Sequence, residues 1–172
     1  CASSRDRVDV DGASIAFETW GDPGRPGIVL VHGSNAHLEW WRFVAPFLAD
    51  QFHVVALDSS GNGESGWRGT YDGATFAKEV LTVARAAGLG PYPAVVGHSF
   101  GGFVALETGA LYGRELAGVV LVDFTVAPPE RYMEWGLRAE RENKRPRKTR
   151  VYADREAAVA RFRLLPDQPV AH

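Results

Sequence analysis

The segment Gly97–Gly101 reads Gly-His-Ser-Phe-Gly, with one serine between two glycines. A serine hydroxyl becomes a useful nucleophile when a neighbouring group removes its proton. Here an apolar run ends just before Ser99 and an apolar helical pattern begins just after it, which is the context such a nucleophile requires. A purely structural turn would avoid backbone strain by using glycine in place of the serine. We therefore predict that Ser99 is a catalytic nucleophile, and that Gly97 and Gly101 leave room for a sharp turn around it.

Other residues that could do chemistry also follow apolar runs. His32, Gly33 and Ser34 come directly after one run, Asp58 after a second and Asp123 after a fourth. In an open parallel sheet the carboxyl ends of the strands share one edge, and ligands bind there. We therefore expect these side chains to gather with Ser99 on one rim of the protein.

The elements that must position them alternate along the chain. A polar and apolar alternation on both sides of Asp11-Gly12 predicts an antiparallel hairpin. Short apolar runs without alternation are typical of parallel strands buried on both faces. Four such runs occupy residues 27–33, 52–59, 93–99 and 117–124. Helical patterns separate them, so we predict an α/β fold with a doubly wound, mostly parallel sheet that begins with the antiparallel hairpin.

Two of the helical patterns predict which side chains face the core. In residues 38–50, Trp40, Val44 and either Phe47 or Leu48 share a face at helical spacing. In residues 75–88, the corresponding face carries Phe76 and Val80, followed by Val83 or Ala84 and by Ala87. A third helix is expected to open directly after Ser99.

Three ordered motifs resemble those of the α/β-hydrolase fold superfamily, in its serine-nucleophile branch with a helical cap. GHSFGG at 97–102 resembles the nucleophile elbow, VHGSN at 31–35 the oxyanion loop, and DSSGNGES at 58–65 the turn after the fourth strand. In that last motif Ser60 stands where the family usually has arginine, and Asn62 where it usually has histidine. The resemblance covers only the N-terminal part of the family's fold.

The resemblance implies an acyl-transfer mechanism in which Ser99 attacks a carbonyl carbon. The negative charge on the carbonyl oxygen is expected to be held by the backbone N–H of Phe100 and by that of Ser34 or Asn35. Such fixed donors stabilise the charge that develops in the transition state. Gly33, next to His32 in the supporting loop, would let the backbone approach the substrate oxygen without a side chain between them.

In the family the serine works in a triad with an acid and a histidine base, and this sequence identifies these two partners less clearly than the serine. Asp123 is the candidate acid, although an aspartate at a strand end is also an ordinary turn or cap residue. Asp58 is a weaker candidate because it belongs to the rim turn. The family places its histidine after a later strand, and none of the five histidines, His172 included, occupies that position. We therefore expect the general base to lie outside this chain and the fragment alone to be inactive.

The chain is expected to divide into a partial hydrolase core, residues 1–127, and a partial helical cap, residues 128–172. The cap is expected to begin with a helix and to end with a helix capped by Asp154. Between them, residues 143–150 are rich in lysine and arginine, which we interpret as a solvated connection. Because the chain starts without methionine, we expect its beginning to be cut.

Composition limits the classes of partner and compartment. The 172 residues carry a formal net charge of -2 and one cysteine. This charge gives no reason to expect nucleic acid or a membrane surface as partner, and the cysteine count favours a cytoplasmic protein. His32 and His37 lack a clear third ligand, so no metal site is expected, and no cofactor either. The expected partner is a small-molecule acyl substrate.

These observations predict a serine hydrolase that acts on a carboxylic ester or a similar acyl compound. Two alternatives stay open. The same fold and serine can serve carbon–carbon bond hydrolysis, lyase or perhydrolase chemistry. The protein could also be a hydrolase-like binding protein that keeps the pocket without turnover.

Overall fold

The computed structural model describes residues 2–128, 130–131, 134 and 151–161. The chain divides into two compact units, residues 1–125 and 126–172, and each is described by itself. The predicted boundary between core and cap, at 127/128, stays a prediction.

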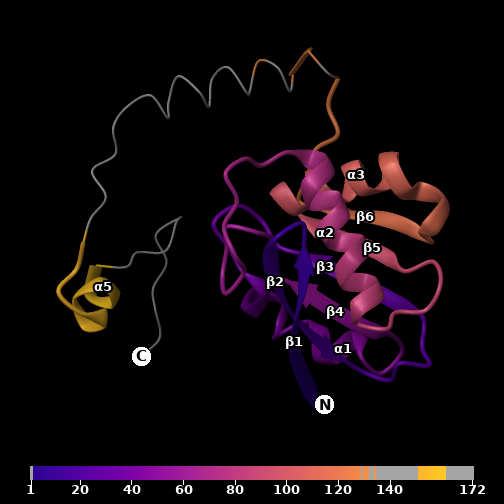
Figure 1. Ribbon diagram of the computed structural model, residues 1–172, viewed down its shortest axis with the longest axis horizontal. Helices are drawn as coiled ribbons and strands as arrows, with labels where there is room; N and C mark the ends of the chain where they lie inside the picture. Colours follow the sequence, from indigo (N-terminus) through magenta and orange to yellow (C-terminus); the bar gives the residue numbers. More distant parts are fainter. Residues whose placement is uncertain (1, 129, 132–133, 135–150, 162–172) are drawn as a thin grey trace. The chain divides into compact units, whose positions relative to one another are not determined.

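The first unit is built on one six-stranded sheet with the order β1-β2-β4-β3-β5-β6 (Figure 1). β1 and β2 pair antiparallel, β2 also pairs antiparallel with β4, and the remaining pairs are parallel. This confirms the predicted α/β fold with its mostly parallel sheet. The strands are β1 (Ser3–Val10), β2 (Ala13–Trp20), β3 (Gly27–Val31), β4 (His53–Leu57), β5 (Ala94–His98) and β6 (Gly118–Val122).

The N-terminal hairpin closes at the predicted two-residue turn. Val10 lies opposite Ala13, and both residues between them have positive φ, 49° for Asp11 and 82° for Gly12. A tight hairpin turn with positive φ at both central positions matches the twist of the flanking strands, and Asp-Gly is a preferred pair for it.

Two apolar layers cover the two faces of the sheet. Every residue of β3 and β4 is buried, as expected for strands covered on both sides. The same expectation is wrong for β6, whose residues are all exposed or half-buried, because β6 is the last strand of the described sheet and pairs only with β5. On one face, alternate residues such as Val29, Val31 and Leu57 pack in a core cluster with the helices α2 (Gly73–Ala86) and α3 (Phe100–Tyr112). On the other face, residues such as Leu30 and Val54 pack with Trp20, Leu38 and Ala45.

Helix α2 agrees with the predicted pattern. Phe76, Val80, Val83 and Ala84 are buried. The helix begins after Asp72, whose carboxylate accepts a hydrogen bond from the Thr75 N–H at 2.7 Å. Such a cap satisfies a donor that the first turn of a helix leaves unpaired. Helix α3 opens directly after Ser99, also as predicted, and the 3-10 turn η2 (Gly113–Glu115) follows it.

The predicted helix over residues 38–50 is wrong in its length and in its buried face. The segment forms a 3-10 turn, η1 (Leu38–Trp41), and a short helix, α1 (Ala45–Leu48). Pro46 explains the break, because it has no N–H to donate and its ring would clash with the carbonyl four residues earlier in a continuous helix. The residues predicted to face the core are therefore turned outward: Trp40 is 60% exposed, Val44 39% and Phe47 73%, whereas Leu38, Ala45 and Ala49 are buried.

In the second unit the structure describes one helix, α5 (Arg155–Arg161). The Ala157 N–H donates to the Asp154 carboxylate at 2.8 Å, so the predicted cap is present. Most of the predicted first cap helix, the basic run 143–150 and His172 lie outside the described residues.

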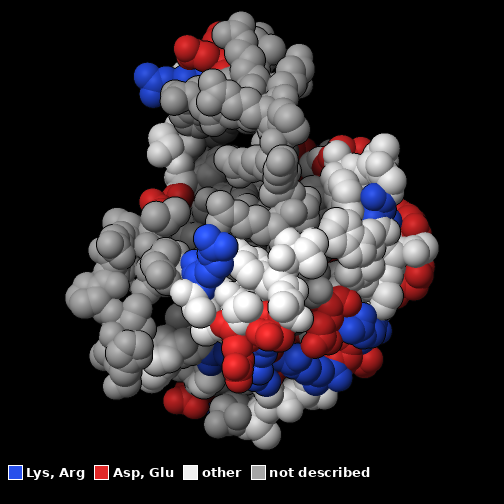
Figure 2. Space-filling model, turned by 90° about the vertical axis from the view of Figure 1, so that its left-hand side faces the viewer, with Lys and Arg blue, Asp and Glu red and all other residues white. Residues whose placement is uncertain are grey.

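The described residues contain no helix that is both long and apolar enough to cross a membrane. In the same part of the chain no three histidine, cysteine or acidic side chains gather as metal ligands would. On the face of the molecule in Figure 2, the acidic and basic side chains that are described lie intermixed.

Candidate active site

Ser99 occupies a strained turn between β5 and α3. Its backbone angles are φ 52° and ψ −117°, a region that serine rarely adopts. The turn is fixed on both sides, because the Ser99 N–H donates to the Val122 carbonyl at 3.0 Å and the Ser99 carbonyl accepts from the Gly102 N–H at 2.8 Å. A half-buried serine held in this way at a helix N-terminus has the geometry of a nucleophile elbow.

The glycines around Ser99 allow backbone segments to approach closely. A Cβ at Gly97 would lie 1.9 Å from the carbonyl oxygen of Gly101. A Cβ at Gly101 would lie 2.3 Å from the carbonyl oxygen of Val31, at the end of β3. Neither contact could be relieved by a side-chain rotation, so the sharp turn depends on glycine at both positions.

His32 is a buried structural residue of the loop after β3. The Ser59 N–H donates to His32 Nε2 at 3.1 Å, which places the ring proton on Nδ1. Nδ1 in turn donates to the Gly33 carbonyl at 2.8 Å. Burial lowers the pKa of His32, partly offset by the Gly33 hydrogen bond and the Asp58 charge. With both nitrogens engaged and the ring held neutral, His32 is not available as a base for Ser99.

Asp58 joins the same loop to the turn after β4. Its buried carboxylate accepts from the Leu38 N–H at 2.7 Å and from the Glu64 N–H at 2.8 Å. Gly63 faces this carboxylate so closely that a Cβ there would lie 2.1 Å from Oδ2. Asp58 and His32 therefore anchor the two ends of the loop 33–37.

The loop 33–37 and the start of α3 present backbone donors near Ser99. Asn35 has a positive φ of 56°, and the Ala36 N–H turns back to the Gly33 carbonyl at 3.3 Å. Within the described residues the N–H groups of Ser34, Asn35 and Phe100 have no protein acceptor. Donors of this kind suit the charge that develops on a substrate oxygen.

Gly33 is packed against the turn that carries Ser99. A Cβ at this position would lie 3.0 Å from His98 Nδ1 and 3.3 Å from Ser99 Cβ. The Phe100 ring points away into the core. Its centroid lies 5.5 Å from that of the Phe76 ring, in an edge-to-face arrangement, and 5.8 Å from that of the Phe103 ring, in a tilted one. The two motifs that are 66 residues apart in sequence are therefore adjacent in the fold.

Asp123 lies at the end of β6, next to the turn that holds Ser99. It directly follows Val122, the acceptor of the Ser99 N–H. Its side chain is exposed and its φ is 48°, so its backbone is also strained. Phe124, the next residue, sits against α3, where a Cβ at Gly102 would come within 2.6 Å of its ring.

No histidine among the described residues forms a hydrogen bond with Ser99. His53 begins β4, at the amino end of the parallel strands, whereas Ser99 follows the carboxyl end of β5. Burial lowers the pKa of His53, and its Nδ1 has no partner in the described part of the chain. His37 precedes η1 and His98 precedes Ser99, each half-buried.

Sequence reasoning missed a buried ion pair beneath the turn after β4. Glu79 of α2 is fully buried and accepts from Arg68 Nε at 2.9 Å and from the Ser60 N–H at 3.0 Å. Arg68 also donates to the Val10 carbonyl at 2.6 Å. A signal was present, because Glu79 lies three residues after Phe76 and four before Val83, on the apolar side of the helix.

A cavity of about 230 Å³ opens between η1 and the ends of β5 and β6. Its lining is mostly apolar and includes Gly33, which packs against Ser99, and His98, which precedes it. The residues around it are His32, Gly33, Trp40, Trp41, Val44, His98 and Val122.

Two curated proteins are similar to this chain in sequence. The uncharacterized hydrolase YugF of Bacillus subtilis is 33% identical over 118 residues, which cover 67% of this chain and 42% of YugF. The lipase LipV of Mycobacterium tuberculosis is 31% identical over 113 residues, which cover 66% of this chain and 42% of LipV. The chain thus spans less than half the length of either relative.

Solved structures show the same fold. A thioesterase domain from the curacin biosynthetic pathway superposes with a TM-score of 0.72 at 23% identity, covering 94% of this chain and 61% of that domain. A membrane phospholipase A superposes with a TM-score of 0.67 at 31% identity, covering 78% of this chain and 46% of the other. Residues 26–171 match the family described as alpha/beta hydrolase fold, and this chain belongs to that family.

Proposed function

We propose that the whole protein hydrolyses a carboxylic ester or a similar acyl compound through an acyl-enzyme on Ser99. The observation that carries this proposal is the strained backbone of Ser99 at the start of α3, fixed by hydrogen bonds on both sides. A turn without a chemical role would relax by using glycine, because strain of this kind costs about 1–3 kcal/mol. The names of similar proteins, a lipase, a thioesterase domain and a phospholipase A, support an acyl substrate.

The proposed reaction begins with attack of Ser99 Oγ on the substrate carbonyl carbon. The carbonyl oxygen gains the negative charge and accepts hydrogen bonds from the N–H of Phe100 and from that of Ser34 or Asn35. Collapse of this intermediate breaks the bond to the leaving alcohol, which receives the proton taken from Ser99. Water then attacks the acyl-enzyme and releases the carboxylic acid, and Ser99 regains its proton.

The proton transfers require a base, which we propose is a histidine outside these 172 residues. Two features support this assignment: no described histidine bonds Ser99, and the chain spans only 42% of the curated relatives. We propose Asp123 as the acid that would orient this histidine. Its support is its place after Val122, beside the nucleophile turn, with a carboxylate that has no protein partner among the described residues.

Steady-state kinetics on the protein as its gene encodes it test the proposal. A panel of p-nitrophenyl esters with different acyl groups would be compared for the wild type, Ser99→Ala and Ser14→Ala. Ser14 is an exposed serine of β2, so its variant controls for the substitution itself. We expect kcat to fall by about 10³-fold or more in Ser99→Ala and to be unchanged in Ser14→Ala. Unchanged turnover in Ser99→Ala would refute the assignment, and no turnover of any ester by the wild type would favour a binding protein.

A further inference from the structure

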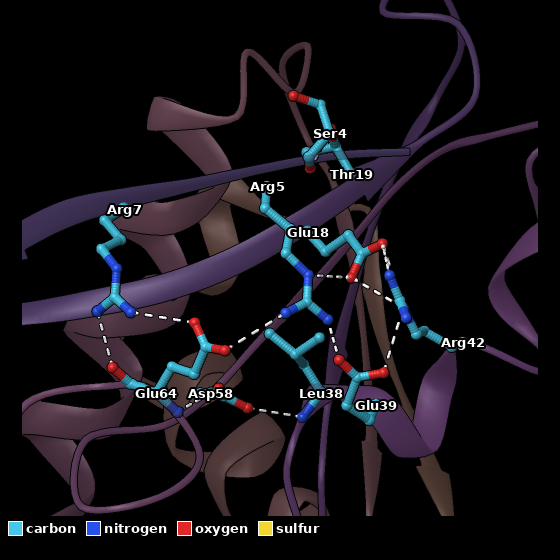
Figure 3. A network of polar contacts seen from close by, with 10 residues as sticks. All are labelled: Ser4, Arg5, Arg7, Glu18, Thr19, Leu38, Glu39, Arg42, Asp58 and Glu64. Atoms are coloured by element: carbon cyan, nitrogen blue, oxygen red, sulfur yellow. Dashed lines mark hydrogen bonds and ion pairs between the residues drawn. The ribbon is translucent and has the colours of Figure 1, made fainter. Parts of the chain in front are cut away.

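Four ion pairs form a closed ring that joins β1, β2 and the segment of η1 (Figure 3). Arg5 of β1 and Arg42, the residue after η1, both pair with Glu18 of β2 and with Glu39 of η1. Outside the ring, Arg5 also reaches Glu64 Oε1 at 3.5 Å. The Arg5 Nε lies 2.9 Å from Glu18 Oε2, and the Arg42 Nη2 lies 3.0 Å from Glu18 Oε1. Arg42 Nε lies 3.2 Å from Glu39 Oε2, and Arg5 Nη2 closes the ring on Glu39 Oε1.

Glu18 is the buried member of this ring. Its side chain is fully buried, whereas those of Arg5 and Arg42 are 40% and 48% exposed. Burial alone would raise the pKa of Glu18, but hydrogen bonds from Arg42, Ser3 and Arg5 outweigh it and hold the pKa below its usual 4.5. Glu18 is therefore charged at neutral pH. Moving Arg5 or Arg42 away would leave this buried charge without a partner, which is energetically costly. The carboxylate of Glu18 therefore opposes displacement of both guanidinium groups.

The ring holds one end of the segment that carries Trp40 and Trp41, the two tryptophans that line the cavity. Leu38, the first residue of η1, is bound through its N–H to Asp58. Arg42, directly after η1, is bound through Nε and Nη2 to Glu18. Trp40 and Trp41 lie between these two anchors and line the cavity together with Gly33 and His98. The short 3-10 turn has few helical hydrogen bonds of its own, so its position depends on the anchors at its ends.

We propose that Glu18, acting through Arg42, is a positioning residue that sets the tryptophan wall of the cavity beside Ser99. Planar guanidinium groups bind carboxylates through two nitrogens at once, which fixes direction as well as distance. The relevance of this wall to substrate selection rests on the function proposed for Ser99. The positioning itself is a property of the folded chain and can be tested without turnover.

The first readout is ¹⁹F NMR of the protein with its five tryptophans replaced by 5-fluorotryptophan, assigned through single Trp→Phe variants. We expect Arg42→Gln and Glu18→Gln to shift or broaden the signals of Trp40 and Trp41 and to leave Trp67, which is 81% exposed, unchanged. Arg42→Lys keeps the charge but not the two-nitrogen geometry, so its spectrum should fall between those of the wild type and Arg42→Gln. Arg85→Gln, which breaks the exposed pair with Glu115, is the matched control.

The second readout is hydrogen exchange of peptides from residues 38–44. Exchange there should become about tenfold faster in Arg42→Gln and stay at the wild-type rate in Arg85→Gln. Because Arg42 is half-exposed and Arg5 still pairs with Glu18, this variant should fold even if Glu18→Gln does not. Unchanged Trp40 and Trp41 signals with unchanged exchange would overturn the proposal, and the ring would then be a general contribution to stability.

Activity separates this inference from the proposed function. If the whole protein turns over esters, Arg42→Gln should raise KM severalfold with little change in kcat, because the wall contacts substrate and not the reacting atoms. If Ser99 proves not to be a nucleophile, the NMR and exchange measurements still test whether Glu18 and Arg42 position Trp40 and Trp41.

Discussion

The backbone N–H of Ser99 donates a hydrogen bond of 3.0 Å to the carbonyl of Val122, the residue before Asp123. This bond joins the turn after β5 to the end of β6, so the candidate nucleophile and the candidate acid belong to one connected piece of backbone. Both residues have positive φ, 52° for Ser99 and 48° for Asp123. Strain at two adjacent strand ends indicates that this rim is held in a defined shape by the packing around it.

Gly102→Ala tests whether the Phe124 contact maintains that shape. The new methyl group would meet the Phe124 ring at 2.6 Å, so we expect the free energy of unfolding to fall by about 1–3 kcal/mol. Turnover of the whole protein should also fall, because Phe124 follows the candidate acid directly. The matched control is Gly113→Ala, where the methyl group meets nothing within 4 Å. Urea unfolding measures the unfolding free energy of the two variants. Equal values for Gly102→Ala and Gly113→Ala would show that the Phe124 ring moves aside freely.

Arg68→Ala tests the ion pair beneath the turn after β4. Arg68 is 10% exposed and Glu79 is fully buried, so the variant leaves a buried carboxylate without its partner. We expect a loss of about 3–5 kcal/mol in unfolding free energy. Lys78→Ala, one residue before Glu79, removes an exposed pair with Asp11 and should cost at most about 1 kcal/mol.

The double variant Arg68→Met/Glu79→Leu should be more stable than Arg68→Ala, because it removes the buried charge together with its partner. A double variant that loses as much as Arg68→Ala, or more, would instead assign the effect to the other hydrogen bonds of Arg68, such as that to Val10.

The stability of the protein should fall between pH 7 and pH 5 in part because of His32. Burial lowers the pKa of this histidine in the folded state, so the unfolded chain binds the proton first as the pH falls. The stabilisation is complete above the usual pKa of 6.5 and is lost below it, with a slope of up to about 1.4 kcal/mol per pH unit. Chemical denaturation at a series of pH values measures this slope.

The variant His32→Gln should show a smaller slope over the same pH range, and so should His53→Gln, whose pKa burial also lowers. Glu18 also contributes stability that is lost as the pH falls, but over a more acidic range. Its pKa is lowered in the folded state, so this stabilisation is lost only below about pH 4.5. An identical slope in the wild type and both histidine variants would contradict the assignment of neutral buried rings.

Local patterns in the sequence were enough to predict most of the fold. The hairpin turn at Asp11-Gly12, the four apolar runs and the spacing of Phe76, Val80 and Val83 each describe an element by its own residues. Burial on both faces makes a strand uniformly apolar, and a helix on a core shows its 3.6-residue period.

The segment around η1 could not be predicted in the same way. Its apolar residues share a helical spacing, but Pro46 interrupts the helix, and long-range contacts place the turn. The pair between Arg5 and Glu39 joins residues 34 positions apart, and Leu38 is bound to Asp58 from 20 positions away. The role of His32 likewise depends on Ser59, in another loop. Such contacts depend on the assembled sheet and leave no periodic signal.

Trapping the acyl-enzyme is the first experiment to make, because it shows whether Ser99 carries the acyl group. The whole protein would be mixed with an excess of an activated ester and quenched in acid within seconds, followed by intact-mass measurement and peptide mapping. We expect one added acyl mass on the peptide that contains Ser99, and none in Ser99→Ala. An adduct on another residue, or ester turnover by Ser99→Ala at the wild-type rate, would contradict this expectation.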